Sequence, residues 1–378
     1  MILPPEVNFL IGLGVFWLAL YALSRVAHLD KHGLEVKPFY FMYRSKALNK
    51  TLDSWARRRR KLWLVLSNIS IAFAVGLMVF SVYFLLSNLL RFIFPIGVAS
   101  PVVPIIPGLT LRLYWLPYFV FAAVVVILTH ELGHGIVARL ENIPVLSTGI
   151  LAALVFFGAF VEPDEKEFEK ASLKARLRML AVGSSTNLIT ALLAFLLLGG
   201  LFAAPSGVLI LETVPNGPAE AVGLTQWDAI HAINGSSTPT SWDFADYMNQ
   251  TKPGDTLILN TNKGDIPINS ESDETGRAVI GIFFFPFSDY RSSIFGLPHY
   301  VNVNLLVTLF WLYLLALSVA IFNMFPLYPF DGERFLYYPL KRLMGKRKLR
   351  LREALNAVFL GIFAGNVILS FVGGLPLI

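Results

Sequence analysis

Six long apolar runs constrain the fold of this chain more than any other feature. They lie at roughly 7–24, 62–90, 116–138, 177–203, 302–327 and 354–375, and a helix needs about 18 such residues to cross the hydrocarbon of a bilayer. Only 15% of the residues are charged and the mean hydropathy is +0.63, whereas a water-soluble domain carries about 25% charged residues. The sequence therefore predicts a polytopic α-helical membrane protein with about six transmembrane helices.

The basic residues predict the orientation of these helices. Most of the 31 Lys and Arg residues lie in three connections, 25–61, 139–178 and 334–352. The positive-inside rule places such connections in the cytoplasm, so both termini are expected outside. We interpret the basic runs as topology determinants and contacts with lipid headgroups, and we expect no nucleic-acid partner. The absence of cysteine excludes thiolate metal ligands and a cysteine nucleophile.

The apolar segment 144–161 is almost long enough to be a further span. A crossing there would move the basic cluster at 341–352 to the outside, against the charge rule. Gly149, Gly158 and the β-branched residues of this segment suit strands. We therefore expect a membrane-embedded β-hairpin, which protein or a water-lined cavity must cover because extended backbone in lipid lacks hydrogen-bond partners.

The segment between the fourth and fifth runs has the pattern of a small α/β domain. It contains "GPAEAVGLTQWDAIHAING", with β-rich runs at 208–214 and 256–262 and helices expected at 216–222 and 241–250. It resembles a PDZ domain of the bacterial protease-associated kind, with Trp227 where that family usually has Gly. The distribution of basic residues predicts that this segment is extracytoplasmic. The resemblance implies that it binds a peptide as an added strand; the alternative is a domain that is only a size filter or spacer over the site.

Residues 127–140 read "ILTHELGHGIVARL" and carry the strongest chemical signal. Because residues four apart share a helix face, His130 and His134 can bind one metal ion. Glu131 is offset by one residue and can reach a water molecule on that metal without being a ligand. The alternative for a single membrane histidine is a hydrogen bond between helices, but three ionisable groups at this spacing are too costly in a membrane for that role.

A hydrolytic zinc site usually has a third protein ligand, and "FNMFPLYPFDGERF" offers Asp331. Pro326 and Pro329 break the helix, and Gly332 relieves steric demands beside the aspartate. The third and fifth spans run in the same direction, so this stretch and the histidine motif both lie at cytoplasmic ends. The alternative is a loop aspartate that begins a cytoplasmic connection.

A third polar cluster, "AVGSSTNLITALLAF", begins the fourth span and contains Gly183 and Asn187. Small residues let helices approach closely, and Ser and Thr hydrogen-bond across them. In the sharper alternative, Asn187 donates to the substrate backbone or to the oxyanion of the reaction. Asn323 is a second candidate for such a donor.

These motifs together resemble the site-2 protease family of intramembrane zinc metalloproteases. The matching features are HELGH at 130–134, the spacing from Gly183 to Asn187, and N-x-x-P-x-x-P-x-D-G at 323–332. The stretch 158–172 also resembles the archaeal-type branch. One departure is "GSSTN", where the family often has Gly-Pro.

The resemblance implies a three-helix catalytic core, one zinc ion per chain and a substrate-presenting role for 144–161. It implies that His130, His134 and Asp331 bind the zinc and that Glu131 is the catalytic acid and base. The expected reaction is hydrolysis of single-span membrane proteins near their cytoplasmic end. The expected partners are such substrates, membrane lipids and a peptide or ectodomain ligand of the PDZ-like domain.

We expect four regions along the chain. They are 1–112, two transmembrane helices with a basic cytoplasmic loop; 113–203, the first part of the catalytic core; 204–290, the PDZ-like domain; and 291–378, the second part of the core. Two rival functions are a metal-ion transporter, which does not explain the spacing of Glu131, and a catalytically silent scaffold, which does not explain an intact set of ligands.

Overall fold

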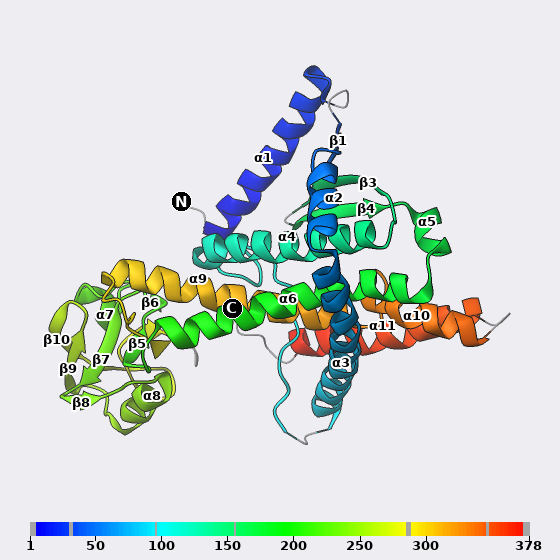
Figure 1. The fold of residues 1–378 in the computed structure, drawn as a ribbon. Helices are drawn as coiled ribbons and strands as arrows, with labels where there is room; N and C mark the ends of the chain where they lie inside the picture. Colours follow the sequence, from blue (N-terminus) through cyan, green and yellow to red (C-terminus); the bar gives the residue numbers. More distant parts are fainter. Residues whose placement is uncertain are drawn as a thin grey trace. The chain divides into compact units, whose positions relative to one another are not determined.

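A computed structural model describes residues 5–29, 33–94, 97–154, 156–284, 289–344 and 348–372 (Figure 1). The chain divides into two compact units. Unit 1 comprises the chain up to Leu193 and from Trp311 onward, and unit 2 comprises Ala194–Phe310. The ends of the chain, for which the sequence predicts an outer location, lie outside the described residues.

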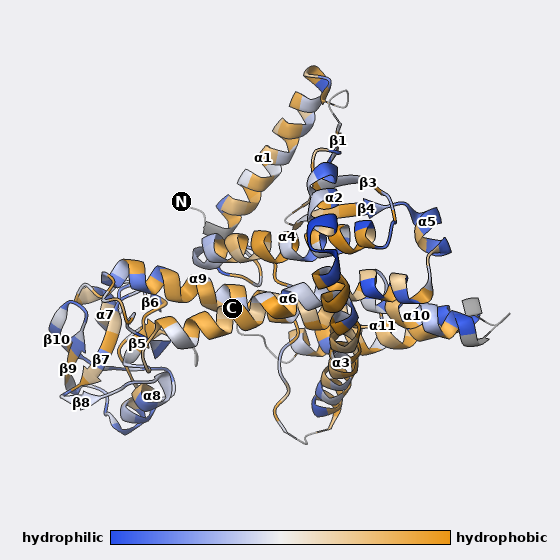
Figure 2. Cartoon of the chain, viewed as in Figure 1, coloured by the Kyte–Doolittle hydropathy of each residue, from blue (hydrophilic) through white to orange (hydrophobic). Residues whose placement is uncertain are grey.

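Six helices within the described residues are long and apolar enough to cross a membrane. They are α1 (Pro5–Val26), α3 (Arg60–Ile93), α4 (Leu116–Leu140), α6 (Leu173–Leu201), α9 (His299–Asn323) and α11 (Lys348–Val372). Each coincides with one of the predicted apolar runs, the last of which extends past the described residues at 373–375. Figure 2 shows hydrophobic residues along these helices and hydrophilic ones in the shorter α2 and α5.

The other helices named for the described residues are shorter. They are α2 (Asn49–Arg58), the 3-10 helix η2 (Leu113–Trp115), α5 (Glu165–Lys170), α7 (Pro218–Ala221), α8 (Ser241–Gln250) and α10 (Asp331–Met344). In α2 one face is buried, and Leu52 on that face packs so closely on Gly135 that a Cβ there would lie 2.9 Å from a Leu52 methyl. Thus α2 lies directly against the end of α4 that carries the two histidines.

Unit 1 contains a four-stranded antiparallel sheet with the order β1-β2-β3-β4. Its strands are β1 (Leu34–Lys37), β2 (Tyr40–Ser45), β3 (Val145–Ala153) and β4 (Phe156–Pro163). The last two form the hairpin expected from 144–161. The first two come from the connection 25–61, where the sequence analysis predicted only a basic loop. As the edge strand, β4 packs against α4.

Unit 2 contains a six-stranded sheet and two strand pairs. The sheet has the order β10-β9-β7-β5-β14, with β8 paired to β7. Its strands are β5 (Gly207–Leu209), β7 (Ala229–Ile233), β8 (Ser236–Ser237), β9 (Thr256–Thr261), β10 (Gly264–Asn269) and β14 (Asp289–Tyr290). The pairs are β6 (Glu212–Thr213) with β13 (Ile282–Phe283), and β11 (Glu271–Ser272) with β12 (Ala278–Val279). The helix predicted at 241–250 is α8.

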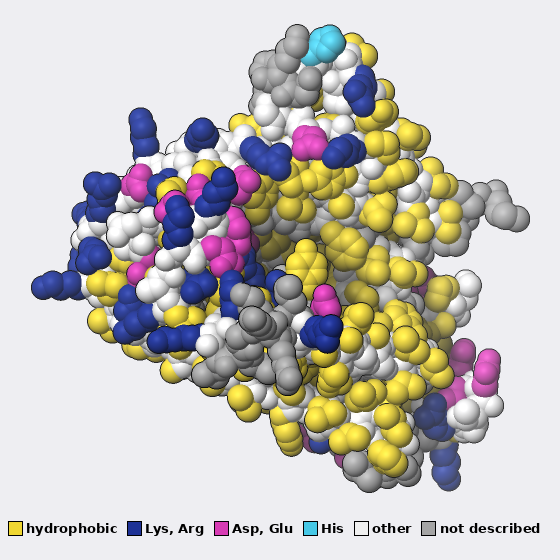
Figure 3. All heavy atoms as spheres, turned by 90° about the vertical axis from the view of Figure 1, so that its right-hand side faces the viewer, with side chains coloured by type: hydrophobic (Ala, Val, Ile, Leu, Met, Phe, Trp, Pro, Cys, Tyr) yellow, Lys and Arg dark blue, Asp and Glu magenta, His cyan; other side chains and the backbone are white. Residues whose placement is uncertain are grey.

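The charged side chains of unit 1 link short elements to one another. Figure 3 shows Lys and Arg gathered with Asp and Glu on one part of the face that it draws, beside a surface of hydrophobic side chains. Between α5 and α10, the Tyr338 hydroxyl donates to Glu169 at 2.7 Å and Lys341 pairs with the same carboxylate at 3.2 Å. Burial raises the pKa of Tyr338, so its hydroxyl remains a donor. These contacts hold α10, the helix that starts at Asp331, against α5.

Candidate metal centre

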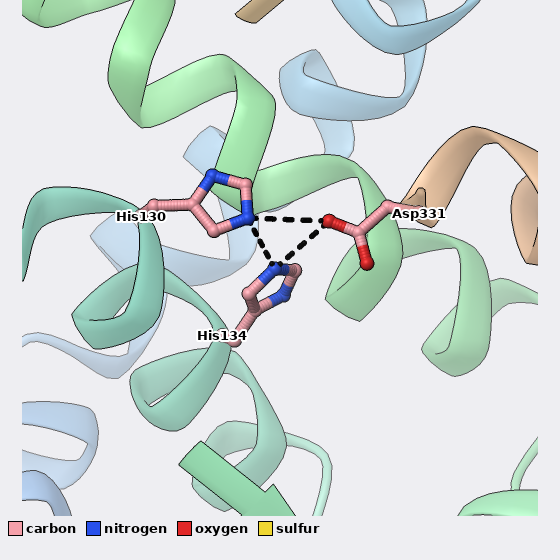
Figure 4. A group of neighbouring side chains, drawn as sticks. All are labelled: His130, His134 and Asp331. Carbon is pink, nitrogen blue, oxygen red and sulfur yellow. Dashed lines mark hydrogen bonds and ion pairs between the residues drawn. The ribbon is translucent and has the colours of Figure 1, made fainter. Parts of the chain in front are cut away.

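Two of the predicted metal ligands lie on consecutive turns of α4. His130 and His134 are both buried, and their Nε2 atoms are 3.1 Å apart. Figure 4 shows the two imidazoles turned toward Asp331, which comes from the start of α10. The Asp331 Oδ2 atom lies 3.3 Å from His130 Nε2 and 3.1 Å from His134 Nε2. The fold therefore brings Asp331 to two histidines that lie about 200 residues earlier in the sequence.

The separations of these three atoms fit a zinc site. Zinc in proteins has bonds of roughly 2.0–2.2 Å to imidazole nitrogen and carboxylate oxygen in tetrahedral geometry, which puts its ligand atoms about 3.3 Å apart. The observed separations of 3.1, 3.1 and 3.3 Å agree with that spacing. Three protein ligands with two nitrogens and one oxygen are also a donor set that catalytic zinc takes.

The other ring nitrogen of each histidine has a partner on α6. His134 Nδ1 lies 2.7 Å from the Met179 carbonyl oxygen, which can only accept a hydrogen bond. The proton of this imidazole is therefore on Nδ1, and Nε2 is left as the ligand atom. His130 Nδ1 lies 3.2 Å from the amide of Asn187, and Thr129 donates to the same amide at 3.0 Å. These contacts fix the orientation of both rings.

Gly183 allows α6 to lie against the two imidazoles. A Cβ at this position would lie 2.4 Å from His134 Nε2 and 2.6 Å from His130 Cε1. Such distances are shorter than any van der Waals contact, so a larger residue would displace the ligand atoms. Gly332 has a similar steric role beside Asp331, because its Cβ would lie 2.2 Å from the Met324 carbonyl oxygen.

The predicted polar donors have different positions. The Asn323 amide donates to Asp331 Oδ2 at 2.8 Å and lies 3.0 Å from His130 Nε2, so it borders the donor set directly. Asn187 is fully buried behind His130. Between α9 and α10, Pro326 is buried and Pro329 is exposed.

Glu131 reaches from α4 to the edge of the sheet. Its Oε2 accepts a hydrogen bond of 2.9 Å from the backbone N–H of Val161 on β4. Glu131, His130 and Asn323 also line a cavity of about 300 Å³, whose other lining residues are apolar and come from α4, α9, β4 and the segment 105–107. The carboxylate therefore lies where a water molecule in this cavity could meet both it and the metal ligands.

Three contacts of this centre were missed in the sequence analysis. Two are made by backbone groups, the Met179 carbonyl and the Val161 N–H, and a backbone group leaves no mark on residue identity. The third is the Thr129 hydroxyl on the Asn187 amide. Its position directly before the HELGH motif was the one available signal.

Comparison with known proteins gives the family. The model of "Peptidase family M50" matches residues 118–365, about two thirds of the chain. A Methanocaldococcus jannaschii protein, "Uncharacterized protein MJ0971", is 27% identical over 344 residues, which cover 89% of this chain and 86% of that one. "Zinc metalloprotease RasP" of Geobacillus kaustophilus is 22% identical over 241 residues, covering 52% of this chain and 57% of that one. Among solved structures, the PDZ domain of the SdrC-like protein Lmo2051 from Listeria monocytogenes aligns with 31% identity and a TM-score of 0.20, covering 21% of this chain and 87% of that domain.

Proposed function

This chain belongs to peptidase family M50, the site-2 proteases, and is a multi-pass membrane zinc metalloprotease; from that premise we propose that it cleaves single-span membrane proteins near their cytoplasmic end. The observation that supports the proposal is the position of Glu131 beside three converging ligand atoms, in the lining of an otherwise apolar cavity. An apolar cavity suits a membrane-spanning substrate, and a carboxylate beside a metal suits hydrolysis.

We propose that His130, His134 and Asp331 hold one zinc ion per chain. When bound, zinc polarises the scissile carbonyl and lowers the pKa of a coordinated water to near neutral. The chain itself supplies the orientation of the ligands. Met179 keeps the His134 proton on Nδ1. The Asn187 amide nitrogen lies 3.2 Å from His130 Nδ1 and limits the rotation of that ring. This position favours a role for Asn187 in orienting His130 over contact with the substrate.

Glu131 moves the protons of the reaction. It takes one from the attacking water and gives one to the leaving amine. The hydrogen bond from Val161 leaves one carboxylate oxygen fixed and the other available for this transfer. Asn323 borders the ligand atoms on the cavity side, so its amide can donate to the oxygen of the tetrahedral intermediate.

The distribution of charge supports the proposed sidedness of the reaction. By the positive-inside rule, the basic connections favour a cytoplasmic location for the end of α4 that carries His134. Cleavage there would release a soluble cytoplasmic fragment. The substrate must unwind first, because a helix keeps its peptide groups in its own hydrogen bonds. The β3–β4 hairpin, embedded at this depth, is the element of the chain that can receive an extended segment.

We further propose that residues 204–290 form a PDZ-like domain on the extracytoplasmic side, between core regions 113–203 and 291–378 and after the N-terminal region 1–112. Its strands and the helix α8 support this assignment. There it would bind a peptide of the substrate ectodomain or exclude bulky ectodomains.

The function is tested with the purified protein and its Glu131→Gln variant. Both are incubated with a panel of membrane-spanning peptides in detergent or liposomes, with and without a chelator, and the products are mapped by mass. We expect the parent to cut near the cytoplasmic end of some peptides, and the chelator to stop cleavage. Glu131→Gln should cleave none while it keeps its zinc, because the carboxylate is not a ligand.

The matched control is Glu167→Gln, which removes an exposed carboxylate from α5 and should cleave like the parent. Full activity of Glu131→Gln would refute the assigned role. Zinc flux into liposomes without any peptide cleavage would instead support a transporter.

A further inference from the structure

The cavity next to the metal centre has a length and a lining that the reaction itself does not require. It has a volume of about 300 Å³, and His130, Glu131 and Asn323 line only part of it. A cavity of about 150 Å³ already holds a benzene molecule, and small-molecule pockets begin at about 300 Å³. The space is therefore sufficient for a large side chain beside the reacting peptide group.

Two helices line the cavity with regularly spaced apolar residues. On α4 the lining residues Phe119, Ala123 and Ile127 recur every four residues and lead up to His130. On α9, Leu315 and Val319 recur in the same way and lead up to Asn323. Since residues four apart share a helix face, each helix presents one continuous apolar stripe that ends at the catalytic groups.

Aromatic rings pack in a row behind Phe119, the residue of the α4 stripe that is farthest from His130. Phe119 packs edge-on against Trp311 at 6.1 Å between ring centroids, and Trp311 packs against Trp115 at 5.6 Å. Both tryptophans are buried, so Phe119 has closely packed rings behind it. Between Phe119 and His130, Ala123 is the small residue of the α4 stripe, and a larger residue there would fill part of the space.

We propose that this cavity binds a large apolar side chain of the substrate, next to the scissile bond, and that Ala123 sets the size of the side chain that it accepts. The proposal rests on the function proposed above. Hydrophobic contact with the lining residues of α4, α9 and β4 selects Leu or Phe over Ala at this position of the substrate. The side chain leaves lipid or water for a preformed apolar space, which costs no rearrangement of the metal ligands.

The test compares the parent with Ala123→Leu and Ala123→Gly on peptides of one cleaved sequence. The peptides differ only in the residue on either side of the scissile bond, which is Ala, Leu or Phe. In the parent, kcat/KM should be higher for Phe than for Ala on one side of the bond. Ala123→Leu should lower that ratio at least tenfold, because one methylene group in a hydrophobic pocket already discriminates by about 10–200-fold and leucine takes up more room than that.

Ala123→Gly enlarges the cavity instead of filling it. If Ala123→Leu binds no zinc, this variant alone tests the proposal. It should raise the ratio of Phe to Ala cleavage. The control is Val124→Leu, which adds the same kind of bulk to a side chain that is 42% exposed on another face of α4, and it should leave the ratio unchanged. Equal ratios in the parent and both Ala123 variants would overturn the proposal. If the parent cleaves no peptide, the proposed function itself fails.

Discussion

The two main sheets of this protein are built differently. In unit 2, β9 alternates between buried and exposed residues, and Leu257 is 2% exposed while its neighbour Ile258 is 50% exposed. In unit 1, β4 has no such alternation, and Phe156 at its start is 52% exposed. The sheet of unit 2 thus covers a hydrophobic core of its own. In the sheet of unit 1, the edge strand β4 presents apolar side chains and backbone groups to α4 and to the cavity beside the candidate metal centre.

The hydrogen bonds at the strand edges explain this difference. Val161 pairs with Thr148 across the hairpin, yet its N–H points away from β3 and donates to Glu131. Alternate residues of an antiparallel strand direct their N–H groups away from the partner strand in this way. The difference indicates that the sheet of unit 2 serves the stability of that unit, whereas the edge strand of unit 1 contacts a side chain of the candidate metal centre.

A matched pair of glycines gives the strongest test of this difference in role between the two sheets. A Cβ at Gly149, on β3, would lie 2.1 Å from the Tyr43 carbonyl oxygen, and a Cβ at Gly207, on β5, would lie 2.6 Å from the Ile230 carbonyl oxygen. Either alanine variant must push two strands apart. Gly149→Ala should lower turnover about 100-fold or more, because displacement of a catalytic group by about 1 Å costs that much.

Gly207→Ala should instead destabilise unit 2 by about 1–3 kcal/mol, as overpacking does. Cleavage of a short membrane-spanning peptide should remain. The measurements are peptide turnover, zinc content and hydrogen exchange of the full chain. Gly149→Ala should keep its zinc, because none of the proposed zinc ligands lies on the sheet. If both variants lose turnover equally, the two sheets do not differ in the way described.

The contact between β4 and Glu131 can be tested without disturbing the hairpin. Val161→Pro removes the N–H that donates to Glu131, and it removes no bond to β3 because that N–H points outward. Val161→Ala removes both γ-methyl groups but keeps the N–H. We expect kcat to fall about tenfold in the proline variant, equivalent to about 1.4 kcal/mol, with KM and zinc content close to those of the alanine variant.

Equal kcat values in the proline and alanine variants would show that Glu131 does not need this donor. A parallel rise in KM would indicate that β4 had moved as a whole.

Motifs and periodicity predicted the parts of this fold that depend on local sequence. The long helices follow from their apolar composition, and the position of Asp331 after a proline break placed it at the same depth as the HELGH histidines. Trp227 stands where the PDZ family usually has glycine, and it has a φ of +72°. That left-handed conformation is one that glycine adopts at no steric cost, so the family pattern was informative even where the residue departs from it.

The sequence could not predict contacts between distant backbone segments. The strands β1 and β2 were missed because their charged surroundings dominate the connection 25–61, and β2 pairs with β3 more than 100 residues later. Strand propensity depends strongly on such partners. For a similar reason, the sequence could not decide whether Asn187 contacts the substrate or serves helix packing. Only the packing of α6 on α4 brings its amide against His130.

The smallest expected effect concerns a buried carboxylate in unit 2. Asp228 accepts hydrogen bonds from Lys263 Nζ at 2.6 Å and from the backbone N–H of Thr225 at 2.7 Å. Burial alone would raise the pKa of Asp228, but these hydrogen bonds outweigh it and hold the pKa below its usual value. A lowered pKa in the folded state means that the stabilisation is present at neutral pH. It is lost as the pH falls below about 4 and through the folded pKa.

Asp228→Asn should therefore destabilise unit 2 by about 1 kcal/mol at neutral pH, the usual size of a net hydrogen-bond contribution. It should also reduce the loss of stability of unit 2 as the pH falls below about 4. Hydrogen exchange in peptides from 207–269 of the full chain, corrected for the intrinsic effect of pH on exchange, measures both effects. The control Asp265→Asn changes an exposed carboxylate on β10 and should stay within about 0.5 kcal/mol of the parent. Because the sheet of unit 1 has no part in this network, peptides from β3 and β4 should exchange alike in all three proteins, and a change there would mean that the two sheets are coupled.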